Sequence, residues 1–201
     1  MKKILGLLAV AVLVFAPKAG ATSVTYLLDN CPSCQGGVYT LTLDTTLNSA
    51  TFTINTTNLA VTNATAIADI AFQLSSGATF FALTSAPDGV ASWKVTQDVQ
   101  VNANGCSNGG NGWVCAAWIG NGYGTSVTPG TQPLTWVFDM SLLGNVGDSV
   151  GLKVRYVDST GEKVGALVSD DAVSTVPEPA SMLLLGSGLL GAGFFGRRRK
   201  K

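Results

Sequence analysis

The middle of the chain is a succession of short segments rich in β-branched and aromatic residues, each followed by a cluster of Gly, Asn, Asp, Pro or Ser. Residues 49–57, SATFTINTT, alternate cleanly, with Phe52 and Ile54 on one side and polar residues on the other. Such segments recur roughly every 8–12 residues, which is typical of all-β domains. We therefore predict an antiparallel β-sandwich of jelly-roll type.

Individual strands are predicted from this pattern at residues 23–29, 37–44, 49–57, 66–74, 79–83, 91–101, 112–119, 133–140 and 149–158. The segment 66–74 is ambiguous, because Ile67, Ile70 and Leu74 have helical spacing, and its neighbours favour a strand. Residues 154–170 indicate a hairpin that turns at 158–162.

The N-terminus has the plan of a secretory signal peptide. Lys2 and Lys3 precede an apolar run at residues 4–16, and Ala19-Gly20-Ala21 is a small-residue cleavage site. We expect cleavage after Ala21, which leaves Thr22 as the mature start. An uncleaved anchor helix is the alternative, but the apolar run is short for one.

The C-terminus combines an uncharged stretch with a basic end. Residues 180–196 contain no charged side chain, and a helix of this length just crosses the hydrocarbon core of a bilayer. A buried core helix is the alternative, but the stretch has no polar face. Basic residues stay on the cytoplasmic side, so the body would lie outside the inner membrane. The predicted stop-transfer residues are Arg197, Arg198, Arg199, Lys200 and Lys201.

The order of features in this tail resembles a known sorting signal. Pro177-Glu178-Pro179, a short hydrophobic span and an Arg-rich end are similar to the PEP-CTERM signal of Gram-negative bacteria. The resemblance implies that exosortase, a membrane-embedded transpeptidase-like enzyme, cuts near the tripeptide and sends the body to the cell exterior, often beside exopolysaccharide. The two prolines keep this segment extended and accessible, as a processing site requires.

Charge and composition narrow the functions open to the body. Residues 22–176 hold four basic and eleven acidic residues, a net charge of −7, which argues against nucleic-acid binding. The chain contains no histidine, which removes the commonest general base and metal ligand. Asp88 and Asp158 lie near loops, but no calcium-loop motif surrounds them. We predict a non-enzymatic protein without metal or cofactor; an Asp-based hydrolase is the least favoured alternative.

Four cysteines remain after export, which favours disulfides. Proximity predicts the pairs Cys31–Cys34 and Cys106–Cys115. A four-thiolate zinc site is an alternative, although the second spacing is wide for it. A thioredoxin-like pair at CPSC is another, but that chemistry needs a helix N-terminus in a βαβ unit.

Two surface features are candidate binding sites. The Gly/Asn-rich segment 102–124 holds Trp113, Trp118 and Tyr123, whose rings would stack on sugars if they are exposed, and otherwise form part of the core. Threonine rows in residues 40–46 and 51–57 would suit an ice-binding surface, although ordinary solvent-facing threonines explain them more simply.

These observations divide the chain into a signal peptide (1–21), a β-sandwich body (22–170), a polar linker (171–176) and a sorting signal (177–201). We predict an exported envelope or extracellular-matrix protein with a structural or interaction role linked to exopolysaccharide. A carbohydrate-binding module is the alternative. The expected partners are exosortase, exopolysaccharide and, transiently, the inner membrane.

Overall fold

The computed structural model describes residues 23–74, 78–102, 104–107, 109–110, 112–128, 133–142 and 149–174, which lie in one compact unit. Two three-residue 3₁₀ helices, η1 (Pro32–Cys34) and η2 (Val90–Ser92), interrupt a series of strands. The strands are β1 (Ser23–Leu28), β2 (Val38–Asp44), β3 (Ser49–Asn55), β4 (Ala66–Gln73), β5 (Ala78–Ser85), β6 (Trp93–Asn102), β7 (Gly105–Ser107), β8 (Trp113–Trp118), β9 (Thr125–Ser126), β10 (Leu134–Leu142), β11 (Ser149–Val157) and β12 (Lys163–Ser174).

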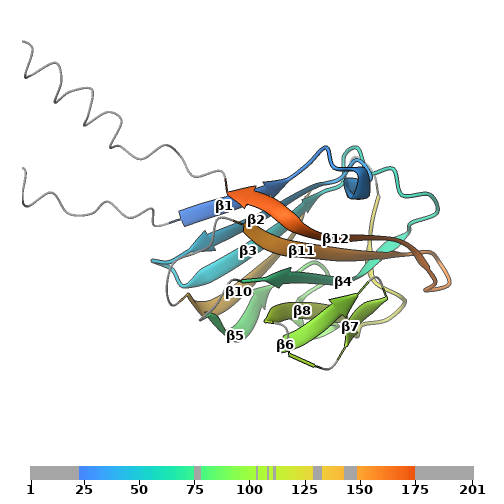
Figure 1. Cartoon of the computed structure of the whole chain (residues 1–201). Coiled ribbons are helices and arrows are strands. Elements are labelled where there is room, and N and C mark those ends of the chain that lie inside the picture. The colour runs from blue at the N-terminus through green and yellow to red at the C-terminus, as the bar shows by residue number, and fades with distance from the viewer. Residues whose placement is uncertain are drawn as a thin grey trace, which may run out of the picture. The chain divides into compact units, whose positions relative to one another are not determined.

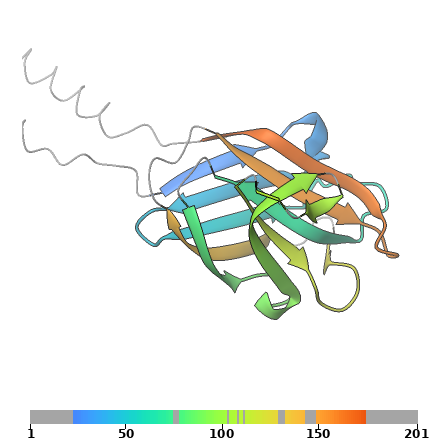
Figure 2. The ribbon, with the colours of Figure 1, turned by 60° about the horizontal axis from the view of Figure 1, so that its bottom comes forward.

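All strand pairs are antiparallel, so the prediction of an all-β antiparallel body is confirmed (Figure 1). The architecture differs from two separate jelly-roll sheets. Hydrogen bonds join the strands in the order β5-β10-β3-β2-β1-β12-β11-β4-β8-β6-β7, and the large sheet curls into a half-barrel (Figure 2). The short β7 pairs with the end of β6 in a second, small sheet.

The curled sheet closes around one main core. Alternate residues of β2 and β3 point inward, as the sequence pattern requires, and include Tyr39, Phe52 and Ile54. Aromatic rings join the two halves of the curl: Phe72 packs edge-to-face on Phe138, with ring centroids 5.0 Å apart. These contacts across the interior show that opposite parts of the curled sheet pack on each other, as two separate sheets do in a sandwich.

β4 confirms the strand interpretation of residues 66–74. Seven of its eight residues are buried, because its inner face meets the main core and its outer face is covered in turn by β7. A strand buried on both faces loses the alternation of polar and apolar residues, which is why this segment also fits helical spacing.

β12 extends farther than the sequence suggested. It ends at Ser174, and its last residues pair with β1, where Tyr26 lies opposite Ser174 and Leu27 opposite Val173. Residues 171–174, which we assigned to a polar linker, therefore belong to the sheet. The first and last strands of the body are neighbours.

The strand directions give the body two ends, which lie at the left and right of Figure 1. The base contains the start of β1, the end of β12 and the β2–β3 turn at residues 45–48. The far end contains η1, η2, residues 119–124 and the β11–β12 turn at 158–162. Both chain ends of the body leave from the base.

Candidate functional site

Both predicted disulfides are present. Cys31–Cys34 closes the loop that contains η1, with Cα atoms 5.0 Å apart, and Cys106–Cys115 joins β7 to β8, with Cα atoms 6.4 Å apart. All four cysteines are therefore paired, and they are not gathered into a four-thiolate zinc site. CPSC lies between two antiparallel strands, not at the N-terminus of an α-helix in a βαβ unit.

The Cys31–Cys34 loop is tied to the core by two tyrosines. The hydroxyl of Tyr39 donates to the carbonyl oxygen of Cys34 at 3.0 Å and lies 2.8 Å from the hydroxyl of Tyr156. Burial raises the pKa of Tyr39 to about 12, and burial also raises the pKa of Tyr156 well above its ordinary value. These neutral phenols form a structural hydrogen-bonded pair.

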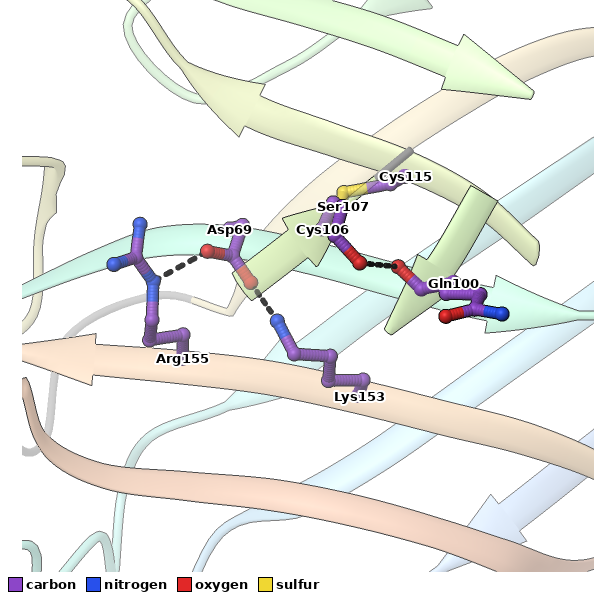
Figure 3. Close-up of a disulfide and its surroundings, with 7 residues drawn as sticks. All are labelled: Asp69, Gln100, Cys106, Ser107, Cys115, Lys153 and Arg155. Carbon is purple, nitrogen blue, oxygen red and sulfur yellow. Dashed lines mark hydrogen bonds and ion pairs between the residues drawn. A yellow bond between two sulfur atoms is a disulfide. The ribbon is translucent and has the colours of Figure 1, made fainter. Parts of the chain in front are cut away.

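A buried ion cluster lies on the outer face of β4 and β11 (Figure 3). Asp69 accepts from the Nζ of Lys153 and from the Nε of Arg155. The side chains of Asp69 and Lys153 are almost fully buried, whereas that of Arg155 is 27% exposed. Burial lowers the pKa of Lys153, and the Asp69 carboxylate partly opposes that shift. The carboxylate of Asp69 therefore compensates the buried charge of Lys153 and also binds the partly exposed Arg155.

A flap formed by β7 covers this cluster. Gly105 has φ +132°, and a Cβ there would lie 3.4 Å from Oδ2 of Asp69, so the β7 backbone lies directly over the carboxylate. The Cys106–Cys115 disulfide fixes the flap to β8. Beneath it, Ala71, Val99 and Trp113 form a second small hydrophobic core.

The three aromatic residues predicted as glycan contacts do not form one platform. Trp113 is only 5% exposed, beneath the flap, so its ring is not available to a ligand. Trp118 is partly buried and packs edge-to-face on Trp93. Tyr123, in contrast, is 54% exposed at the far end.

Tyr123 rests against the β11–β12 turn. Gly161 has φ +85°, and a Cβ there would lie 2.2 Å from the Tyr123 ring, so only glycine permits this contact. Asp158 shapes the turn by accepting from the backbone N–H and the hydroxyl of Thr160 and from the N–H of Glu162. The hydrogen bonds from Thr160 lower the pKa of Asp158. Tyr123 thus presents an exposed ring that packs against a turn ordered by the hydrogen bonds of Asp158.

The predicted threonine rows are also present on the outer face. Thr25 lies opposite Thr42, and their hydroxyls are 3.0 Å apart; Thr53 lies opposite Thr135, with hydroxyls 3.3 Å apart. Because the hydroxyls bond to one another across strands, the rows stabilise the sheet as ordinary cross-strand pairs do.

The signal-peptide residues and the sorting residues Pro177 to Lys201 lie outside the described residues. Within the described part of the chain, no helix is long and apolar enough to cross a membrane. The last described residue, Ser174, is still paired with β1. The C-terminal tail therefore begins directly at the end of β12.

Comparison with known families decides what that tail is. Residues 175–200 match the PEP-CTERM protein-sorting motif. The chain carries a PEP-CTERM sorting tail. The PEP-CTERM motif implies export, processing by exosortase and sorting to the cell envelope. No curated protein matches the chain.

Proposed function

We propose that this protein is a non-enzymatic surface or matrix protein whose β body is delivered to the cell exterior and acts there beside exopolysaccharide. The observation that carries the proposal is that the PEP-CTERM motif starts at residue 175, immediately after β12. The body is thus a compact cargo attached to its sorting tail. Its precursor is held in the inner membrane by residues 180–196, with the body in the periplasm.

The chemistry of the body supports a structural or interaction role. The chain has no histidine, and its buried carboxylate, Asp69, is held by two cations under a disulfide-fixed flap. A carboxylate so enclosed has no access to a substrate. The hydrolase alternative would rest on exposed loop aspartates such as Asp158, whose Oδ1 already shapes its own turn.

The sorting part of the proposal is tested by the intact mass of the protein recovered outside the cell. We expect a chain that begins at Thr22 and ends near Pro177–Pro179. An external protein that still carries Arg197–Lys201 would contradict processing. Incubation of the same material with the host's exopolysaccharide should release no shorter chains, and any release would overturn the non-enzymatic assignment.

Glycan binding at the far end is the second candidate function, and the exposed ring of Tyr123 favours it. Tyr123 lies in a segment rich in Gly and Asn and its ring rests against Gly161; Ile119, four residues before Tyr123, is also exposed. Aromatic faces stack on sugar rings while neighbouring polar groups bond hydroxyls.

Co-sedimentation of the mature protein with the host's exopolysaccharide tests this second function. Tyr123→Ala should weaken binding about tenfold, the loss expected when a stacking contact of roughly 1.4 kcal/mol is removed. Tyr123→Trp should retain binding, because it keeps an aromatic face. Equal binding by all three proteins would exclude the Tyr123 site.

A further inference from the structure

We infer that the base of the body is the surface that meets the membrane-embedded exosortase, because the chain between the sheet and the cut region has almost no slack. The inference rests on the proposed sorting function and adds to it a contact between the enzyme and the folded cargo. Three features carry it: the end of β12, the position of the motif and the exposed turn beside them.

The first feature is the length of the tether. Ser174 is paired with Tyr26 in the sheet, and Pro177 is only the third residue after it. A fully extended chain covers at most about 3.6 Å per residue, so Pro177 lies no more than about 11 Å from the end of β12. The body itself has a radius of gyration of about 15 Å for its size. An enzyme that binds the motif therefore has to lie in contact with the body.

The second feature is the start of the hydrophobic stretch. Ala180 is the sixth residue after Ser174, so the end of β12 lies at most about 22 Å from the start of that stretch. The polar layer of a bilayer takes up about 5–8 Å of this distance on each side. While residues 180–196 span the membrane, the base must remain close to the membrane surface.

The third feature is an apolar side chain at the base. Leu47, at the tip of the β2–β3 turn, is 73% exposed. Asp44 holds the turn by accepting from the N–H groups of Thr46 and Leu47, each at 2.8 Å. Asp44 also pairs with Ser23, the first residue of β1, so the turn lies next to the strand that carries the mature N-terminus. Leu47 is therefore placed to contact a membrane protein that approaches the motif.

A tether series in the native host tests the inference. One variant lacks Thr175 and Val176, a second replaces them with Gly-Ser, and a third inserts ten Gly/Ser residues after Ser174 in the deletion variant. The rate at which exported precursor loses its basic tail is followed by immunoblot and intact mass. We expect the deletion to slow processing at least tenfold, the replacement to leave it unchanged and the insertion to restore it.

The outcomes distinguish failure of the proposed sorting function from failure of the proposed contact with exosortase. If the unmodified protein is never processed, the proposed sorting function fails and this inference fails with it. If the unmodified protein is processed and the deletion variant is processed equally fast, the sorting function stands and the inference is overturned. Protease resistance and complete disulfide formation in each variant show that the body is folded.

A pair of surface variants tests the contact itself. Leu47→Ser should slow processing several-fold, because it removes the apolar contact at the base. Val90→Ser is the matched control, since Val90 is a 42% exposed apolar residue in η2 at the far end. Equal processing of both variants, or equal slowing of both, would exclude Leu47 as a contact.

Discussion

The two outer faces of the curled sheet differ in how they are finished. The face formed by β1, β2, β3 and β10 carries rows of threonines whose hydroxyls bond across strands, such as Thr25 with Thr42. The face formed by β4, β8 and β11 is covered by β7, and beneath this flap lie a disulfide, a small apolar core and the ion cluster of Asp69. One face is stabilised by weak hydroxyl pairs between strands and the other by a few strong, interdependent contacts.

This difference shows why the covered face needs its cysteines. A buried carboxylate and a buried ammonium are tolerated only while they stay paired. β7 is only three residues long, so strand pairing alone holds it weakly. The Cys106–Cys115 bridge attaches it covalently to β8. The face of β1, β2, β3 and β10 requires no such cover, because its threonine hydroxyls can be hydrated without loss of stability. Single substitutions should therefore have much larger effects on the covered face.

The largest effect is expected from Asp69→Ala. Lys153 would then be left buried without its partner, which typically costs about 3–5 kcal/mol in the free energy of unfolding. Chemical denaturation of the mature protein measures this loss. The control is the double variant Asp69→Leu with Lys153→Met, which removes both charges and should lose far less. If both proteins lose the same amount, charge burial is not the reason.

The next effect concerns the tyrosine pair in the interior between the two faces. The pKa of Tyr39 is raised to about 12, so the folded protein keeps this proton between pH 10 and 12 while the unfolded chain releases it. The stabilising contribution is complete below pH 10 and is lost as the pH rises toward 12. Denaturation midpoints should fall steeply over that range, and Tyr39→Phe should reduce the slope. An unchanged slope would assign the alkaline transition to other groups.

A smaller effect is expected from the disulfides. Loop entropy gives a bridge of the Cys106–Cys115 spacing at most about 2.6 kcal/mol and one of the Cys31–Cys34 spacing about 1.6 kcal/mol. The double variant Cys106→Ser with Cys115→Ser should exceed its loop value, because the flap over Asp69 also opens. Cys31→Ser with Cys34→Ser is the matched control. Amide exchange at β4 should speed up in the first variant alone.

The smallest effect is expected on the threonine face. Thr25→Val removes one cross-strand hydroxyl pair but keeps the shape and the β propensity of the side chain. The free energy of unfolding should change by less than about 0.5 kcal/mol, in either direction. A loss of several kcal/mol would show that this face is also a cooperative unit, and the contrast between the two faces would fail.

Local patterns in the sequence predicted the strands well. The alternation at Phe52 and Ile54 located β3, and the short loops between cysteines predicted both bridges. Long-range features were missed for a physical reason. Asp69 and Lys153 meet across β4 and β11 although they are far apart in the chain, and no local pattern specifies that pairing. A charged residue inside the apolar run AIADIAF was the available signal.

The same limit applies to the candidate glycan residues. The sequence placed Trp113, Trp118 and Tyr123 in one Gly/Asn-rich segment, but which ring is exposed depends on tertiary packing. The flap buries Trp113, and Gly161, from a hairpin distant in sequence, supports Tyr123. The curl of the sheet was likewise unpredictable, since alternation reports which side of a strand is apolar and not what that side faces.

The pairing of β1 with β12 also fixes the timing of folding during export. β1 crosses the membrane first, but its neighbour on one side is the last segment of the body to arrive. Contacts between such distant parts of a chain form slowly. The edge of β1 that pairs with β12 therefore stays unpaired until the end of the body has been exported. Because the sorting motif follows β12 directly, the sheet is completed only when the segment next to the motif has arrived. The order of the strands thereby makes the arrival of β12 the last step in completing the sheet.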